Sequence, residues 1–390
     1  MNVTRRLALR CLPSLGGLPL VARLSFVSIA GVAGCASRGQ LADLGELTTN
    51  DSVIRWQFKG GEAGIGFSPA LGGDLIWAAD QRGRMTAIER ETGKVVHQFD
   101  LKRSLVTGVA VDAERQIVID AEGVLLVLDR DGTTRWSASL GAEPTSLPAI
   151  AGGLVLIRLS NGSLVAHDLR SGERRWLYLQ SDPPLVLRQT SGIATDAVNA
   201  YVGVSSGLVV ALSLASGATL WESRISVARG ANEIERINDV VGMPVIDGAT
   251  ICAAAYQGRV TCLNANNGEP IWSEDLRAAS GIAMNRQRQM IMVDVDGNVT
   301  AFSPRRERLW QQQALRGRRP AAPALIGDRL WIGDGGGVAH SLDPLDGRLT
   351  GRIVIDRSAI VAAPIAVPGA GRDLALFQTS GGRIAALDSA

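Results

Sequence analysis

The sequence is poor in histidine, cysteine, aromatic residues and net charge. Its 390 residues include three histidines, four cysteines and 4% aromatic residues, and 40 basic residues nearly balance 38 acidic ones. So few histidines disfavour sites that need clusters of them for metal binding or acid–base catalysis. The balanced charge argues against a broad nucleic-acid-binding surface. The apolar run over residues 24–33 is half the roughly 20 residues of a membrane-spanning helix, which disfavours a permanent span.

Glycine and small apolar residues are abundant. The chain has 45 glycines and 46% hydrophobic residues, which indicates a globular, turn-rich protein and excludes a disordered one. Its length alone would suggest two or three domains, but all-β rings and barrels are commonly longer than that estimate allows.

The first 34 residues have the pattern of an export signal. They contain four arginines and no acidic residue, followed by the apolar run and by Val32, Ala33 and Gly34 directly before Cys35. Small residues before a cysteine resemble the bacterial lipobox, which implies cleavage before Cys35 and acylation of its thiol. The Ala36 that follows implies, in that family, delivery to the outer membrane.

Two alternatives stay open for this segment. Thr4-Arg5-Arg6 hints at twin-arginine export instead of the general secretory route, and Cys35 could be an ordinary buried cysteine beside a signal peptide. Removal of residues 1–34 takes away four positive charges, so the net charge changes from +2 to −2. We expect residues 35–50 to form a flexible tether between a lipid anchor and the folded part.

Cys252 and Cys262 flank a turn centred on residue 257. A three-residue turn would place them directly opposite each other, where a disulfide is possible, whereas a two-residue turn would offset them by one. Because the periplasm is oxidising, a disulfide and two buried free thiols are both reasonable predictions.

The rest of the chain is one repeated unit. A motif that begins with glycine and continues as an alternating strand occurs eight times, at intervals of 39 to 51 residues. In its clearest copies, a turn of the type Asp/Ser-x-x-Ser-Gly and a tryptophan follow the strand. This period is typical of propeller blades. The motif glycines are Gly83, Gly123, Gly162, Gly207, Gly258, Gly297, Gly337 and Gly382.

Each unit reads as four short strands, and no segment shows helical periodicity. The eighth unit stops before its fourth strand, whereas residues 52–56 form an unassigned strand at the start. We therefore predict an all-β, eight-bladed β-propeller of four-stranded antiparallel blades over residues 51–390, closed by the N-terminal strand.

Tryptophan occupies six of the eight equivalent positions in the fourth strand, and we expect it to pack between blades. The eight positions are Trp56, His97, Trp136, Trp176, Trp221, Trp272, Trp310 and Gly351. Aspartates in the repeats are expected to cap turns rather than to catalyse; they are Asp129, Asp168, Asp343 and Asp388.

Three motifs suggest chemistry but fail on context. Residues 203–207 match a nucleophile elbow, yet a hairpin rather than a strand–helix turn is expected there. Residues 333–337 are a glycine-rich loop without the lysine and helix of a phosphate site. The basic run 316–319 is typical of a solvated loop.

The repeat resembles that of pyrroloquinoline quinone (PQQ) dehydrogenases, which are eight-bladed propellers with a calcium ion and a quinone cofactor. Those enzymes characteristically carry an adjacent cysteine pair over the cofactor, and the cysteines here are isolated. A PQQ-dependent dehydrogenase is therefore the alternative prediction, and no cofactor or metal is expected.

Consecutive intervals of 45 and 51 residues mark two insertions, one after Trp176 and one after Trp221. Both connect an outer strand to the next blade, so they should emerge on the same face. The first carries Leu185, Leu187 and Arg188, which suit a protein-binding surface unless the two leucines fill the gap between blades.

In the second insertion, residues 230–239, with Pro244 and the stretch 256–261, resemble the most specific part of the BamB family, outer-membrane lipoproteins of the β-barrel assembly machinery. The resemblance implies a non-enzymatic scaffold that binds the periplasmic POTRA domains of BamA and assists unfolded outer-membrane proteins. A propeller that binds another envelope protein is the further alternative. The resemblance assigns partner binding to Leu185, Leu187, Arg188 and Asp239, and we expect the neighbouring Glu235 and Arg236 to bind the partner as well. Val241 stands where the family has a second acidic residue.

Overall fold

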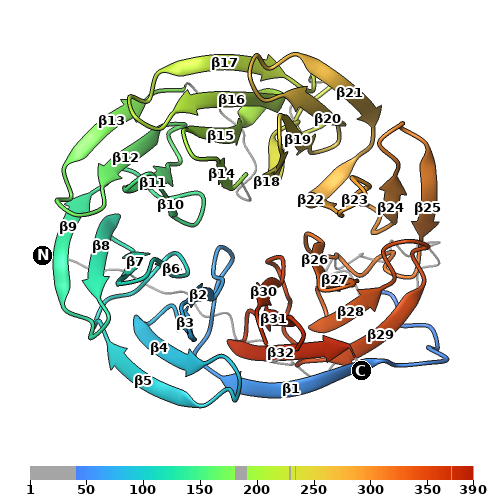
Figure 1. Ribbon diagram of the computed structural model, residues 1–390, viewed down its shortest axis with the longest axis horizontal. Coiled ribbons are helices and arrows are strands. Elements are labelled where there is room, and N and C mark those ends of the chain that lie inside the picture. The colour runs from blue at the N-terminus through green and yellow to red at the C-terminus, as the bar shows by residue number, and fades with distance from the viewer. Residues whose placement is uncertain (1–40, 181–190, 228–229, 233, 370, 390) are drawn as a thin grey trace, which may run out of the picture. The chain divides into compact units, whose positions relative to one another are not determined.

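We analysed a computed structural model that describes residues 41–180, 191–227, 230–232, 234–369 and 371–389. The described chain forms eight four-stranded antiparallel sheets, and Figure 1 shows them as the blades of a ring with their first strands innermost. The predicted all-β propeller is thereby confirmed.

The first four blades follow the chain in order. Blade 1 contains β2 (Ala70–Gly72), β3 (Leu75–Ala79), β4 (Arg84–Glu89) and β5 (Val95–Asp100). Blade 2 contains β6 (Ala110–Val111), β7 (Arg115–Ile119), β8 (Val124–Asp129) and β9 (Thr134–Ser139). Blade 3 contains β10 (Ala149–Ala151), β11 (Leu154–Arg158), β12 (Leu164–Asp168) and β13 (Arg174–Tyr178). Blade 4 contains β14 (Ile193–Thr195), β15 (Asn199–Val204), the 3-10 turn η1 (Ser205–Gly207), β16 (Leu208–Ser213) and β17 (Thr219–Arg224).

The second half of the ring repeats this order, and its last blade closes the circle. Blade 5 contains β18 (Val240–Asp247), β19 (Thr250–Ala255), β20 (Arg259–Asn264) and β21 (Pro270–Asp275). Blade 6 contains β22 (Ala278–Met284), β23 (Met290–Asp294), β24 (Val299–Phe302) and β25 (Arg308–Gln312). Blade 7 contains β26 (Ala324–Ile326), β27 (Arg329–Gly333), β28 (Val338–Leu342) and β29 (Leu349–Val354). Blade 8 contains β30 (Ile365–Val367), β31 (Leu374–Gln378), β32 (Arg383–Ser389) and β1 (Ser52–Lys59).

The N-terminal strand completes the last blade, as predicted. β1 pairs antiparallel with β32, and Trp56 lies opposite Ala386. The same register holds in every other blade, where His97, Trp136, Trp176, Trp221, Trp272, Trp310 and Gly351 each lie opposite a residue of the third strand. The sequence repeat therefore corresponds to one structural position.

Tryptophan joins neighbouring blades through both its ring and its N–H. The Trp221 indole N–H donates to Ala265 O of blade 5 at 2.8 Å, and a Cβ placed on Gly268 would lie 2.6 Å from the indole ring. Gly268 also has a φ of 72°, which favours glycine. Four other tryptophans make the same kind of bond; they are Trp56, Trp136, Trp176 and Trp310.

Trp272 departs from this pattern. The turn that faces it in blade 6 has Arg306 at a φ of 76° where the other turns have glycine. Within the described chain, the buried Trp272 N–H has no hydrogen-bond partner.

The motifs that suggested chemistry lie in hairpins. Residues 203–207 run from β15 through η1 into β16, so a strand rather than a helix follows the serines. Gly333 is the last residue of β27, and residues 334–337 form the turn between β27 and β28. Both segments therefore have the structural role that the repeat predicted.

Each blade has two ends, which define two faces of the ring. Second-to-third strand turns and blade-to-blade connections share one end, here called the connection face; the other two turns of each blade lie at the opposite end, the hairpin face. Both insertions lie in blade-to-blade connections and therefore on the connection face.

Residues 41–50 differ from the expected tether. Arg318 donates to Ala42 O at 2.7 Å, and Arg352 donates to Gly45 O at 2.6 Å. This described part of the segment expected to be flexible is therefore hydrogen-bonded to blade 7 and to the connection before it. Residues 1–40, including Cys35, lie outside the described residues.

Candidate partner-binding surface

The first insertion is described only at its base. Leu185, Leu187 and Arg188 lie outside the described residues, so the structure does not place them. At the base, Tyr178 Oη contacts Gln180 Oε1 at 2.6 Å and Glu222 Oε1 of blade 4 at 3.2 Å. Burial, and then the charge of Glu222, raise the pKa of Tyr178 to about 12. The phenol therefore remains protonated at neutral pH and joins the loop base to the neighbouring blade.

The described residues of the second insertion are joined to one another by hydrogen bonds of their own side chains. Glu235 Oε2 accepts a hydrogen bond from Ala231 N at 2.8 Å, and Asn232 Oδ1 accepts one from Glu235 N at 2.9 Å. Arg236 Nε donates to Gly230 O at 3.2 Å. Both Glu235 and Arg236 are exposed, so they are accessible to a partner while they also shape the loop.

Asp239 lies inside this loop rather than on its surface. It is 5% exposed, its Oδ1 accepts a hydrogen bond from Ser206 N at 3.1 Å, and its carbonyl accepts one from Tyr256 N. The side chain therefore ties the insertion to η1 and to blade 5. In this conformation the carboxylate is buried, and the partner contact that the resemblance implied for Asp239 stays a prediction.

Val241, at the position of the family's second acidic residue, has a packing role. It lies in β18, is 4% exposed and belongs to the apolar core between blades 5 and 6. A carboxylate buried there would lose its hydration, so valine suits this site.

Four exposed apolar side chains, absent from the residues expected at the site, stand on or beside the insertions. Leu179, Val227, Ile234 and Met243 are between 59% and 73% exposed. Leu179 and Val227 flank the two connections, and Ile234 lies at the tip of the second. Exposed apolar side chains on an ordered loop are a common feature of protein-binding sites. The only sequence signal that could have identified these residues is their position in or beside the insertions, because the sequence does not distinguish an exposed isoleucine from a buried one.

A cavity of about 310 Å³ lies beneath the second insertion. Ser226, Glu235 and Ile237 form its insertion side, and residues 257–259 and 275–277 of blade 5 form the other. Arg259 and Asp275 make an ion pair at its rim. The cavity is large enough to receive one or two side chains of a bound partner.

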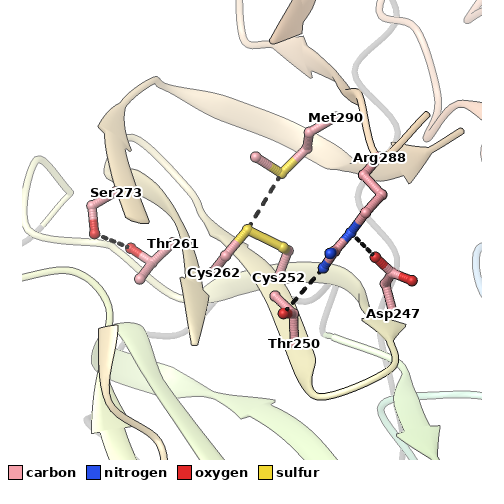
Figure 2. The surroundings of a disulfide bond; sticks show 8 residues. All are labelled: Asp247, Thr250, Cys252, Thr261, Cys262, Ser273, Arg288 and Met290. Carbon is pink, nitrogen blue, oxygen red and sulfur yellow. Dashed lines mark hydrogen bonds and ion pairs between the residues drawn. A yellow bond between two sulfur atoms is a disulfide. The ribbon is translucent and has the colours of Figure 1, made fainter. Parts of the chain in front are cut away.

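The cysteine pair lies at the core of blade 5. β19 and β20 are joined by three residues, Cys252 lies directly opposite Cys262, and the two sulfur atoms are bonded. Figure 2 shows the disulfide next to Met290 of blade 6, with Cys262 Sγ 3.9 Å from Met290 Sδ. The bond crosslinks β19 and β20 of blade 5, the blade that follows the second insertion in the chain.

Two observations concern metals and membranes. Within the described ranges, no group of three or more His, Cys, Asp and Glu residues is arranged to hold a metal ion. In the same residues, no helix combines the length and apolar character of a membrane span.

The chain matches known proteins over most of its length. The family model for outer membrane protein assembly factor BamB matches residues 81–282 and 257–366. The protein of that name from Burkholderia pseudomallei is 34% identical over 333 residues, which are 84% of this chain and 86% of that protein. The one from Bordetella pertussis is 31% identical over 78% of this chain and 79% of that protein.

Solved structures share the fold. The crystal structure of BamB from Moraxella catarrhalis has a TM-score of 0.78 and 23% identity, and covers 86% of this chain and 99% of that one. A quinohemoprotein alcohol dehydrogenase from Comamonas testosteroni has a TM-score of 0.66 at 13% identity, and covers 87% of this chain and 76% of that one. The second likeness reflects a common propeller scaffold alone. By the family match and the identity to its relatives, the chain belongs to the BamB family of outer membrane protein assembly factors.

Proposed function

We propose that this protein is a non-enzymatic scaffold of outer-membrane protein assembly that binds the POTRA domains of BamA through the connection face of blades 4 and 5. In this proposal, acylated Cys35 anchors the protein to the periplasmic side of the outer membrane. The observation that carries the proposal is that Ile234 of the second insertion is 69% exposed and is followed by the exposed charged residues Glu235 and Arg236.

The energetics of recognition support this surface. An exposed isoleucine or valine that becomes buried contributes about 1.5–3 kcal/mol, whereas exposed charges at a rim contribute little affinity and more specificity. The internal hydrogen bonds of Glu235 order the loop before binding, which reduces the entropy lost on association. Outer strands such as β5 could in addition offer their edges to unfolded outer-membrane proteins.

The experiment is a pull-down of the purified periplasmic domains of BamA by the wild-type protein and by two variants. Ile234→Asp places a charge in the proposed contact, and Leu345→Asp makes the same change at a residue that is 60% exposed on the hairpin face. We expect recovery to fall with Ile234→Asp and to stay unchanged with Leu345→Asp. Equal recovery with both variants would contradict the assigned surface.

The loop of residues 181–190 is tested separately. We expect the triple variant Leu185→Ala/Leu187→Ala/Arg188→Ala to lose recovery as well, because the resemblance assigns those residues to the same partner. Unchanged recovery would remove this loop from the interface.

A calorimetric titration with PQQ and Ca²⁺ addresses the dehydrogenase alternative. We expect no binding heat, and saturable binding of the quinone would contradict a purely scaffolding role.

A further inference from the structure

The segment before β1 is bound to the ring by two arginines. Arg318 donates through Nη1 to Ala42 O at 2.7 Å, and Arg352 donates through Nη1 to Gly45 O at 2.6 Å. Further along, Asn50 exchanges hydrogen bonds with the main chain of Arg352, each at 3.0 Å. Two of these bonds are accepted by main-chain carbonyl groups of the segment, and the other two involve the side chain of Asn50. Together they fix the path of the segment's backbone.

The first arginine is itself rigidly held. Arg318 is 8% exposed, and its Nε donates to Asp334 Oδ2 at 2.8 Å. Asp334 is fully buried and also accepts a hydrogen bond from His340 at 3.0 Å. A guanidinium that is already oriented in this way loses little conformational entropy when it binds a carbonyl. The basic run 316–319, expected to be a solvated loop, thus includes the residue that binds the N-terminal segment.

The place where this segment leaves the ring is also defined. Ala42 N donates to Gly317 O, and Leu41 packs beside Gly335 and Gly336. Gly317 belongs to the connection between blades 6 and 7, and Gly335 to the second-to-third strand turn of blade 7. Both lie on the connection face, so the chain enters the ring there.

We propose that residues 41–50 are a docked strap that holds the anchored end of the chain at this corner and turns the connection face toward the membrane. The inference rests on the proposed acylation of Cys35. Only five residues separate Cys35 from Leu41, and six residue steps span at most about 20 Å. A lipid surface is therefore the partner that this corner of the ring approaches.

This orientation has a consequence for assembly. The second insertion lies on the same face, so a domain bound at blades 4 and 5 sits on the membrane side of the ring. A freely moving tether of 16 residues, by contrast, would impose no preferred face.

The strap is tested with an engineered disulfide in the full lipoprotein. A Cβ placed on Gly317 would lie 3.2 Å from Ala42 Cβ. This distance is just below the range of about 3.5–4.5 Å that separates the Cβ atoms of disulfides. The matched control pairs Ala42→Cys with Gly327→Cys, a glycine with a similarly positive φ on the hairpin face and no atom within 4 Å. We expect the Ala42→Cys/Gly317→Cys variant to lose its free thiols in non-reducing peptide mapping, and the control to keep them. Free thiols in both variants would overturn the strap.

The orientation is tested with fluorophores on single cysteines in vesicles of phosphatidylethanolamine and phosphatidylglycerol that carry a headgroup quencher. Ile65→Cys reports on the connection face and Leu345→Cys on the hairpin face; both positions are exposed. We expect stronger quenching at residue 65, and a Gly-Ser insertion between residues 40 and 41 to remove the difference. Equal or stronger quenching at residue 345 would overturn the proposed orientation. Mass spectrometry of the same sample reports acylation of Cys35, so a missing anchor and an undocked strap are separate results.

Discussion

At the residue scale, the contact of one tryptophan with the next blade explains why the repeat keeps this side chain. The indole of Trp221 covers Gly268 and donates to Ala265 O, so one residue supplies apolar contact and satisfies a main-chain carbonyl. Trp272 supplies only the apolar contact, since no described residue accepts its N–H. A comparison of variants at the two tryptophans therefore separates the contribution of the hydrogen bond to stability from that of packing.

We predict that Trp221→Ala lowers the free energy of unfolding by about 3–5 kcal/mol, the usual cost of removing a buried large aromatic side chain. Trp221→Phe should cost about 1 kcal/mol more than Trp272→Phe, because only the first removes a hydrogen bond. Urea denaturation of the purified variants measures both differences. Equal costs for the two phenylalanine variants would show that the indole hydrogen bond adds no stability.

A second residue-scale feature is the buried group formed by Arg318, Asp334 and His340. Burial lowers the pKa of His340, so the imidazole is neutral and donates through Nε2 to Asp334. Burial acts to raise the pKa of Asp334, but hydrogen bonds from His340 and Arg318 outweigh this effect and lower the pKa. The unfolded chain binds a proton at this histidine below about pH 6.5, whereas the folded protein binds it only at a lower pH, because its pKa is lowered. Stability from His340 is thus present above that pH and is lost as the pH falls.

We predict that the wild-type protein is less stable at about pH 5.5 than at about pH 7.5, and that His340→Gln reduces this difference. The exposed His97 provides the control, since His97→Gln leaves the buried group intact. Urea midpoints at the two pH values give the comparison. If His340→Gln leaves the pH dependence of stability unchanged, that dependence arises from other groups.

At the element scale, the hairpin of β19 and β20 shows how far local sequence determines structure. The spacing of Cys252 and Cys262 allowed either a paired or an offset arrangement, and the three-residue turn produced the paired one. The strands themselves could be predicted because apolar alternation and turn glycines recur eight times. Asp239 and residues 41–50 could not, because their positions depend on Ser206, Arg318 and Arg352, which are distant in sequence.

We predict that the natively produced protein has no alkylatable thiol at Cys252 or Cys262 when it is unfolded without reductant. Closing a loop of this length stabilises a protein by about 2–3 kcal/mol in the chain-entropy model, so reduction should lower the melting temperature. Mass spectrometry after alkylation and a thermal scan with dithiothreitol check the two statements. Two alkylated cysteines in the unreduced sample would contradict the disulfide.

At the scale of the whole molecule, the described chain is a ring of equivalent interfaces. Each of eight apolar clusters joins two neighbouring blades, and the cluster that includes Trp56, Ile76 and Ile384 joins blade 8 to blade 1. Figure 1 shows β1 as the outermost strand of the closing blade. Such a scaffold leaves its loops free to vary without loss of the core, and the two insertions use this freedom on the same face.

Binding of the periplasmic domains of BamA to the connection face of blades 4 and 5 is tested by site-specific photo-crosslinking in cells. The photoreactive residue is placed at Ile234 and, as the control, at Leu345. We expect a crosslink to BamA from position 234 and none from position 345. A crosslink from position 345 without one from position 234 would contradict binding at this face.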